Sequence, residues 1–223
     1  MGVNDRDWIK PKRTLLDRWH GLPPLAQNVT VIGGFVLFVV VLIALGRRDG
    51  QTQRDMWDAE SLQYAISYGD VEQFRWILRE SPQLVDTSME GMGDKDRLIH
   101  FVAQSSTPEM MEVLLEFDGN VQAPGTAGRT PLHYAAAAGN VKMVELLIAR
   151  GADVSSQDVV GFTPLIDAAG GDDTKCFPVV QSLVNHGADI NKPTGDGKSP
   201  LEIAEAAGNL RIAALLKQLG AGK

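Results

Sequence analysis

Few residues of this chain have the types and spacing that chemistry requires. His100 and His133 are 33 residues apart, and Asp167, Asp172 and Asp173 are close in sequence, as paired catalytic carboxylates can be. The sequence contains none of the short signatures of zinc proteases, cysteine-pair metal sites, phosphate-binding loops or nucleophile elbows. Solvated loop residues explain the aspartates better than catalysis does. We therefore expect no enzyme, no cofactor and no small-molecule substrate.

The number of cysteines and the charge limit the classes of function and partner that the chain can have. The single cysteine, Cys176, excludes an internal disulfide and leaves the redox compartment open. It could be exposed in a loop, but we favour a small apolar side chain that fills a gap in the core. Residues 51–223 carry 14 basic and 24 acidic residues. An acidic surface repels phosphate, so we do not expect nucleic acid as a partner.

The elements that carry these residues are repeated. Residues 128–140 read GRTPLHYAAAAGN, and weaker copies begin at Gly161 (GFTPLIDAA) and Gly197 (GKSPLEIA). Thr130 is placed to cap a helix that has Pro131 in its first turn, and Gly139 is placed to end it. A second apolar helical run follows each copy. Because such short helices cannot bury their apolar faces alone, neighbouring copies must stack.

The 33-residue period and the T-P-L-H-x-A signature resemble the ankyrin repeat. The resemblance covers residues 57–221 and implies an all-α solenoid of about five helix pairs. It also implies that His100 and His133 hydrogen-bond the backbone of neighbouring loops. The first repeat is degenerate, and its aromatic residues Trp57, Tyr64, Phe74 and Trp76 are predicted to cap the array. The predicted repeats lie near 57–91, 92–124, 125–157, 158–193 and 194–221, with three extra residues within 170–177.

An uncharged apolar stretch precedes the repeats. Residues 25–46 would form a helix of about 33 Å, enough to cross a hydrocarbon core of about 30 Å. We predict a single transmembrane helix there, an amino-terminal arm at 1–24 whose residues 14–20 can lie along the interface, and a juxtamembrane linker at 47–56. A cleaved signal peptide is the alternative, although the region before the apolar stretch is longer than such peptides usually have.

Basic residues flank the predicted span unequally. Five precede it and three follow it closely. This difference predicts a cytoplasmic amino terminus with the repeats on the far side, which is the periplasm if the organism is bacterial. The opposite topology stays open because the margin is small. The layout resembles that of bacterial membrane-tethered ankyrin-repeat proteins.

Ankyrin-like proteins bind partner proteins through hairpin tips and the exposed face of the first helices. Apolar tip residues stand out, because tips that face water are usually polar. Phe162 could instead fold back onto Pro164 or the next repeat, and we leave both interpretations open. The positions that the repeat register assigns to this surface are Thr126, Ala127, Arg129, Val159, Val160, Phe162, Gly195, Asp196, Lys198, Gln104 and Tyr68.

These observations together predict a single-pass, membrane-anchored module that docks a partner protein. Two alternatives belong to other classes. One is an accessory or structural subunit of a membrane complex, held by the span at 25–46 and the arm. The other is an inhibitor or immunity-type protein that covers the active site of an enzyme.

Overall fold

A computed structural model of the protein describes residues 61–88, 95–105 and 107–222, all within one compact unit that spans residues 54–223. The predicted arm, membrane span and linker at 1–24, 25–46 and 47–56 lie outside the described residues. In the part of the chain that is described, no helix combines the length and the apolar character needed to cross a bilayer.

The described chain folds as successive pairs of antiparallel short helices. Each of the five predicted repeat windows contains one pair, and no β strand occurs within 61–88, 95–105 or 107–222. The predicted all-α stack is therefore confirmed for these residues. The pairs are residues 61–68 with α5 (Val71–Glu80), α6 (Leu98–Ser105) with α7 (Pro108–Glu116), α8 (Pro131–Ala137) with α9 (Val141–Ala149), α10 (Pro164–Gly170) with α11 (Phe177–Asn185), and α12 (Pro200–Ala207) with α13 (Leu210–Gln218).

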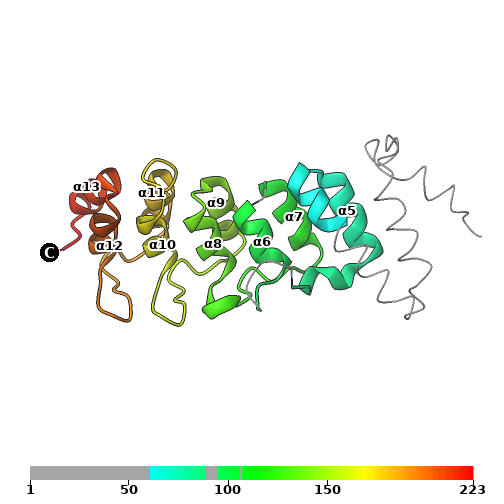
Figure 1. Ribbon diagram of the computed structural model, residues 1–223, viewed down its shortest axis with the longest axis horizontal. Helices are drawn as coiled ribbons and strands as arrows, with labels where there is room; N and C mark the ends of the chain where they lie inside the picture. Colours follow the sequence, from blue (N-terminus) through cyan, green and yellow to red (C-terminus); the bar gives the residue numbers. More distant parts are fainter. Residues whose placement is uncertain (1–60, 89–94, 106, 223) are drawn as a thin grey trace, which may run out of the picture. The chain divides into compact units, whose positions relative to one another are not determined.

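The pairs stand in a row with their helices in two layers (Figure 1). In one layer α6, α8, α10 and α12 pack in sequence order, and in the other layer α5, α7, α9, α11 and α13 do the same. The loops that join one pair to the next extend to one side of the row. Short 3₁₀ turns, η1 (Pro82–Asp86) and η2 (Thr126–Gly128), lie in two of these connections.

Sequence motifs define where the first helices begin. Pro131, Pro164 and Pro200 each occupy the first turn of a helix, where the missing N–H has no intrahelical partner to lose. Ser199 and Glu202 form a complete capping box: Ser199 Oγ accepts from the Glu202 N–H at 3.2 Å, and Glu202 Oε2 accepts from the Ser199 N–H at 2.7 Å.

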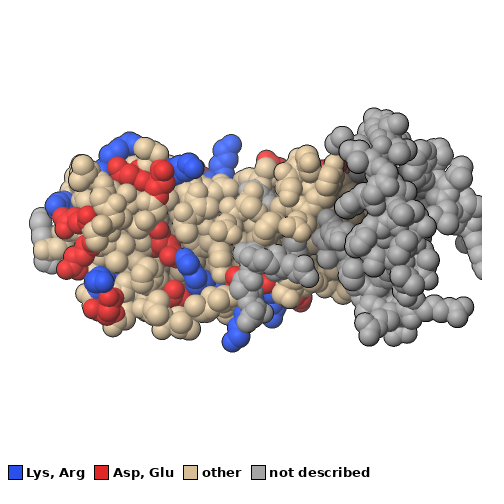
Figure 2. Space-filling model, viewed as in Figure 1, with Lys and Arg blue, Asp and Glu red and all other residues tan. Residues whose placement is uncertain are grey.

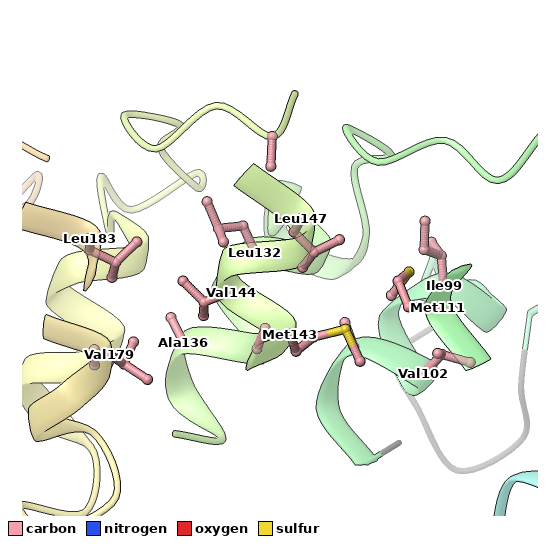
Figure 3. Close-up of a cluster of buried hydrophobic side chains, with 14 of the residues drawn as sticks. Ile99, Val102, Met111, Leu132, Ala136, Met143, Val144, Leu147, Val179 and Leu183 are labelled. Atoms are coloured by element: carbon pink, nitrogen blue, oxygen red, sulfur yellow. The ribbon is translucent and has the colours of Figure 1, made fainter. Parts of the chain in front are cut away.

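The core lies between neighbouring pairs. Side chains of α6 and α7 face those of α8 and α9, which in turn face α11 (Figure 3). Leu132, Leu147 and Leu183 are fully buried there. Small side chains are buried beside them, notably Ala136 and Ala169, and they let adjacent helices approach closely. Each pair thus completes the burial of its neighbour.

The carboxyl-terminal pair carries polar residues where the inner pairs are apolar. By register, Glu205 replaces the buried Ala136 and Ala169, and Lys217 replaces Ile148 and Val184, which pack against the core. The two charged side chains form an ion pair, with Lys217 Nζ 2.6 Å from Glu205 Oε1. A polar outer face is what the terminal unit of a solenoid needs in water.

The predicted aromatic cap at the other end is correct only in part. Phe74 is fully buried in the core, Tyr64 is half-buried, and Trp76 is exposed. Trp57 lies outside the described residues. Trp76 holds the register position of Val113, which is fully buried in the second pair.

The three extra residues of the fourth repeat lengthen the loop between α10 and α11, and this loop contacts the last pair. Asp173 projects from this loop and caps α13, because its carboxylate accepts from the N–H groups of Arg211 at 3.2 Å and Ile212 at 3.0 Å. Asn209 donates back to the carbonyl oxygens of Ala169 and Gly171, both at 2.7 Å. Cys176 is fully buried in this loop, as the gap-filling interpretation predicts.

Removing the cap that Asp173 supplies should weaken the last pair selectively. For Asp173→Ala we expect a loss of about 1 kcal/mol in the free energy of unfolding, the usual value for a lost helix cap. Urea denaturation followed by circular dichroism measures it. Asp173→Asn is the matched control, because its amide oxygen can still accept. Equal stabilities of the Ala and Asn variants would contradict this role.

Candidate functional site

Each of the last three loops between pairs is closed by the same backbone hydrogen bond, which in the first of them joins the Gly125 N–H to the Arg129 carbonyl at 2.8 Å. The N–H of Asp158 donates to the carbonyl oxygen of Phe162 at 2.9 Å, and that of Thr194 donates to Lys198 at 2.9 Å. Neighbouring tips are also joined: the N–H of Val159 donates to Ala127 at 2.8 Å, and the carbonyl of Val160 accepts from Gly195 at 2.8 Å. The tips of the last three connections are therefore linked into one surface.

Asp158 fixes the tip of the fourth repeat. Its Oδ1 accepts from the N–H groups of Val160 at 2.9 Å and Phe162 at 2.8 Å. With the tip-to-tip bonds on both sides, these contacts hold the backbone around Val159 and Val160 in one conformation. A rigid tip loses little conformational entropy when it binds a partner.

The predicted apolar group is exposed only in part. Val159 and Val160 are 74% and 55% exposed, whereas Phe162 is half-buried. The burial of Phe162 agrees with the interpretation that its ring turns back toward the protein. Two adjacent aliphatic side chains on a rigid tip remain as the apolar part of the candidate surface.

The other predicted surface residues differ in their environments. Asp196 and Lys198 are exposed and form an ion pair at 3.0 Å. Gln104 and Tyr68 are exposed, and the ring of Tyr68 lies 4.4 Å from that of Tyr64. On the face shown in Figure 2, acidic and basic side chains alternate over the end of the row formed by α10 to α13, without a large patch of one sign.

The two histidines of the repeated motif hydrogen-bond the backbone of neighbouring loops, as the family resemblance implies. His133 Nε2 donates to the carbonyl oxygen of Phe162 at 3.0 Å, and its Nδ1 accepts from the Thr130 N–H at 3.1 Å. His100 accepts from the Arg97 N–H at 3.0 Å in the same way, and its Nε2 donates to the carbonyl oxygen of Ala123 at 2.9 Å, which lies at a different position of the following loop. Burial lowers the pKa of both rings, that of His133 to about 4. Each ring is therefore neutral at neutral pH.

Polar pairs connect successive repeats beside these histidines. The residue two positions before one first helix contacts the middle of the next first helix. Tyr134 OH donates to Asp96 Oδ1 at 2.7 Å, and Arg129 Nη2 lies 2.5 Å from Asp167 Oδ1. The Arg129 guanidinium also lies over the Tyr134 ring, 5.3 Å from its centre. Gly125 permits this arrangement, because a Cβ there would lie 2.3 Å from Asp96 Oδ1.

The prediction that Asp167 lies in a solvated loop is wrong. Asp167 is part of α10, in the register position of Tyr134, and its side chain is only 8% exposed. Burial raises its pKa to about 6; Arg129 opposes this rise, and Asp158 adds to it. Sequence reasoning missed the pairs Asp96–Tyr134 and Arg129–Asp167, although the repeat spacing contains the signal: Asp96 and Arg129 are 33 residues apart, as are Tyr134 and Asp167.

Comparison with known proteins identifies the family to which the chain belongs. Residues 62–158 match a family model of ankyrin repeats in three copies, and residues 165–216 match a model of ankyrin repeats in many copies. Together the matches cover well over half of the chain, which therefore belongs to the ankyrin-repeat family. Ankyrin repeats generally mediate protein–protein interaction. No curated protein matches the chain.

His133 should make stability depend on pH. Its pKa is about 4 in the folded chain and near 6.5 when unfolded, so between these values only the unfolded state takes up the proton. The free energy of unfolding therefore falls as the pH decreases from 6.5 to 4, by about 3 kcal/mol in total, and His133 adds no further loss below pH 4. In His133→Gln this loss should be absent.

Denaturant titrations of wild type and His133→Gln from pH 7.5 to pH 4 measure the difference between the two curves. Asp167, whose raised pKa acts in the opposite direction, is present in both proteins and cancels in the comparison. His186→Gln changes an exposed histidine and is the control. Parallel curves for wild type and His133→Gln would refute the assignment.

Proposed function

We propose that this protein is a membrane-anchored docking module whose repeat domain binds a partner protein through its linked tips and first helices. The rigid tip that presents Val159 and Val160 to solvent is the observation that carries this proposal. Aliphatic side chains at the centre of a protein interface gain free energy by leaving water. Because the tip is already ordered, little of that gain is lost to entropy.

The membrane anchor in this proposal is supported by the sequence. Residues 25–46 carry no charge over a length that matches a bilayer, and the excess of basic residues before them favours a cytoplasmic amino terminus with the repeats on the other side. Tethering raises the local concentration of the repeat domain near membrane-bound partners, so a surface of moderate affinity suffices.

Replacing the tip valines should abolish docking without unfolding the domain. For Val159→Ser/Val160→Ser we expect at least a tenfold loss of partner in affinity capture from detergent-solubilised membranes, quantified by mass spectrometry, because about 1.4 kcal/mol of lost binding suffices. The free energy of unfolding should change by less than about 0.5 kcal/mol, since both side chains face solvent.

Leu210→Ser is the matched control, because Leu210 is 77% exposed and lies on α13 of the last pair, away from this tip. It should capture as much partner as wild type does. Equal capture by the valine variant and the control would refute the tip as the docking site.

Deleting residues 1–50 should separate anchoring from binding. We expect the full chain to stay in the membrane pellet after an alkaline carbonate wash, because a spanning helix is not held by ionic contacts. The shortened chain should be soluble and should still capture the same partner. Extraction of the full chain by carbonate would disprove the anchor, and a folded, shortened chain that captures nothing would favour the structural-subunit alternative.

A further inference from the structure

The first helices of the first three pairs share a solvent-facing side that is rich in aromatic residues. On α8, Tyr134 is half-buried and Ala137, three residues later, is exposed, so both lie on the side of the helix that faces solvent. The first two pairs have aromatic and uncharged polar residues at the corresponding register positions. This surface, called here the aromatic strip, consists of Tyr64, Tyr68, Phe101, Gln104, Tyr134 and Ala137.

The composition of the aromatic strip differs from that of the domain around it. Residues 51–223 carry 14 basic and 24 acidic residues, yet none of the six residues of the strip is charged. Tyr68 is 69% exposed. The centres of protein interfaces are enriched in aromatic residues and depleted of charged ones. The strip therefore has the composition of a binding surface.

Contacts within the protein hold these rings in place. The rings of Tyr64 and Tyr68 lie 4.4 Å apart, and Phe101 packs against the core. Tyr134 packs against the core as well, and its OH donates to Asp96 Oδ1 at 2.7 Å. Rings that are already ordered lose little conformational entropy when a partner covers them.

The spacing of the rings selects the conformation of the segment that can bind them. Phe101 and Tyr134 hold the same position on α6 and α8, which pack against each other. The axes of packed helices lie about 8–10 Å apart. In a polyproline II helix, side chains on one side recur every three residues, or about 9 Å. In a β strand they recur every two residues, or about 7 Å, which does not match.

Hydrogen bonding also favours a polyproline II segment. Such a segment makes no hydrogen bonds within itself, so its carbonyl groups need donors from outside. The exposed amide of Gln104 lies among the rings of the strip and can donate to one of them. An α-helix bonds most of its own carbonyl groups and would make no use of this donor.

We propose that the partner binds the aromatic strip through an extended, uncharged, proline-rich segment that places one apolar side chain on each of three successive first helices. This inference rests on the proposed docking function and specifies what its first helices recognise. An uncharged segment loses no ionic hydration when it covers an uncharged strip. Proline stiffens the segment before it binds, which lowers the entropy that binding costs.

Selection from a library of random twelve-residue peptides displayed on phage tests the proposal. The full chain in detergent micelles is the bait, and empty micelles remove peptides that bind detergent. We expect the selected peptides to contain prolines and to have apolar residues three positions apart in an uncharged stretch. Changing the prolines of a selected peptide to Ala should weaken its binding at least tenfold, because the free peptide is then no longer ordered.

Two variants of the bait test the aromatic strip itself. Tyr68→Ser removes an exposed ring and should leave the unfolding midpoint unchanged. Phe101→Leu keeps an apolar side chain against the core but removes the ring. Each should weaken binding of a selected peptide at least tenfold. Trp76→Ser is the matched control, because it removes a 59% exposed aromatic side chain from α5, in the other helix layer, and it should bind as wild type does.

Selected peptides without proline, peptides with apolar residues seven positions apart as in a helix, or an empty selection would overturn the inference. Equal weakening by Trp76→Ser and Tyr68→Ser would overturn it as well. Val159→Ser/Val160→Ser leaves the strip intact and should bind the selected peptide as wild type does. The peptide assay and the capture assay for the valine tip can therefore fail independently.

Discussion

Burial of short helices against neighbouring pairs is the constraint on which the rest of this structure depends. A helix of seven to ten residues is marginal in water, and α8 has only seven. Its fully buried residues, Leu132 and Ala136 among them, leave water only because α6 and α10 lie on either side. Loop geometry, histidine hydrogen bonds and the exposed surface are all consequences of that stacking.

The stack also fixes the loops that carry the candidate surface. His133 bonds to the backbone of the next loop, and the tips bond to one another, so the tip of the fourth repeat is held by the repeat before it and the repeat after it. Binding residues on such loops are as well placed as residues on helices. In the proposed docking function, the two valines would therefore meet a partner from a loop that is already ordered.

Much of the fold could be predicted from the sequence, because its signals are local and repeated. The Thr-Pro starts, the glycine stops and the 33-residue period reveal the helix pairs, and the histidine contacts follow from the family resemblance. The surface was less predictable. Whether Phe162 is exposed, and whether Asp167 is buried, depends on contacts with the next repeat that no local pattern encodes. The charged pair at Arg129 and Asp167 became visible only once the repeats were stacked.

The ion pair of Glu205 and Lys217 has a consequence for how such an array can grow. These two residues make the last described pair hydrophilic on the side that an additional pair would cover, and burying them would leave charge without water. Gene duplication can therefore lengthen this protein by copying an interior unit. A copy added after the last pair would have to bury the charged side chains of Glu205 and Lys217. For the same reason, an engineered repeat should be inserted next to the interior pair α8 and α9, whose faces are apolar, and not after the last pair.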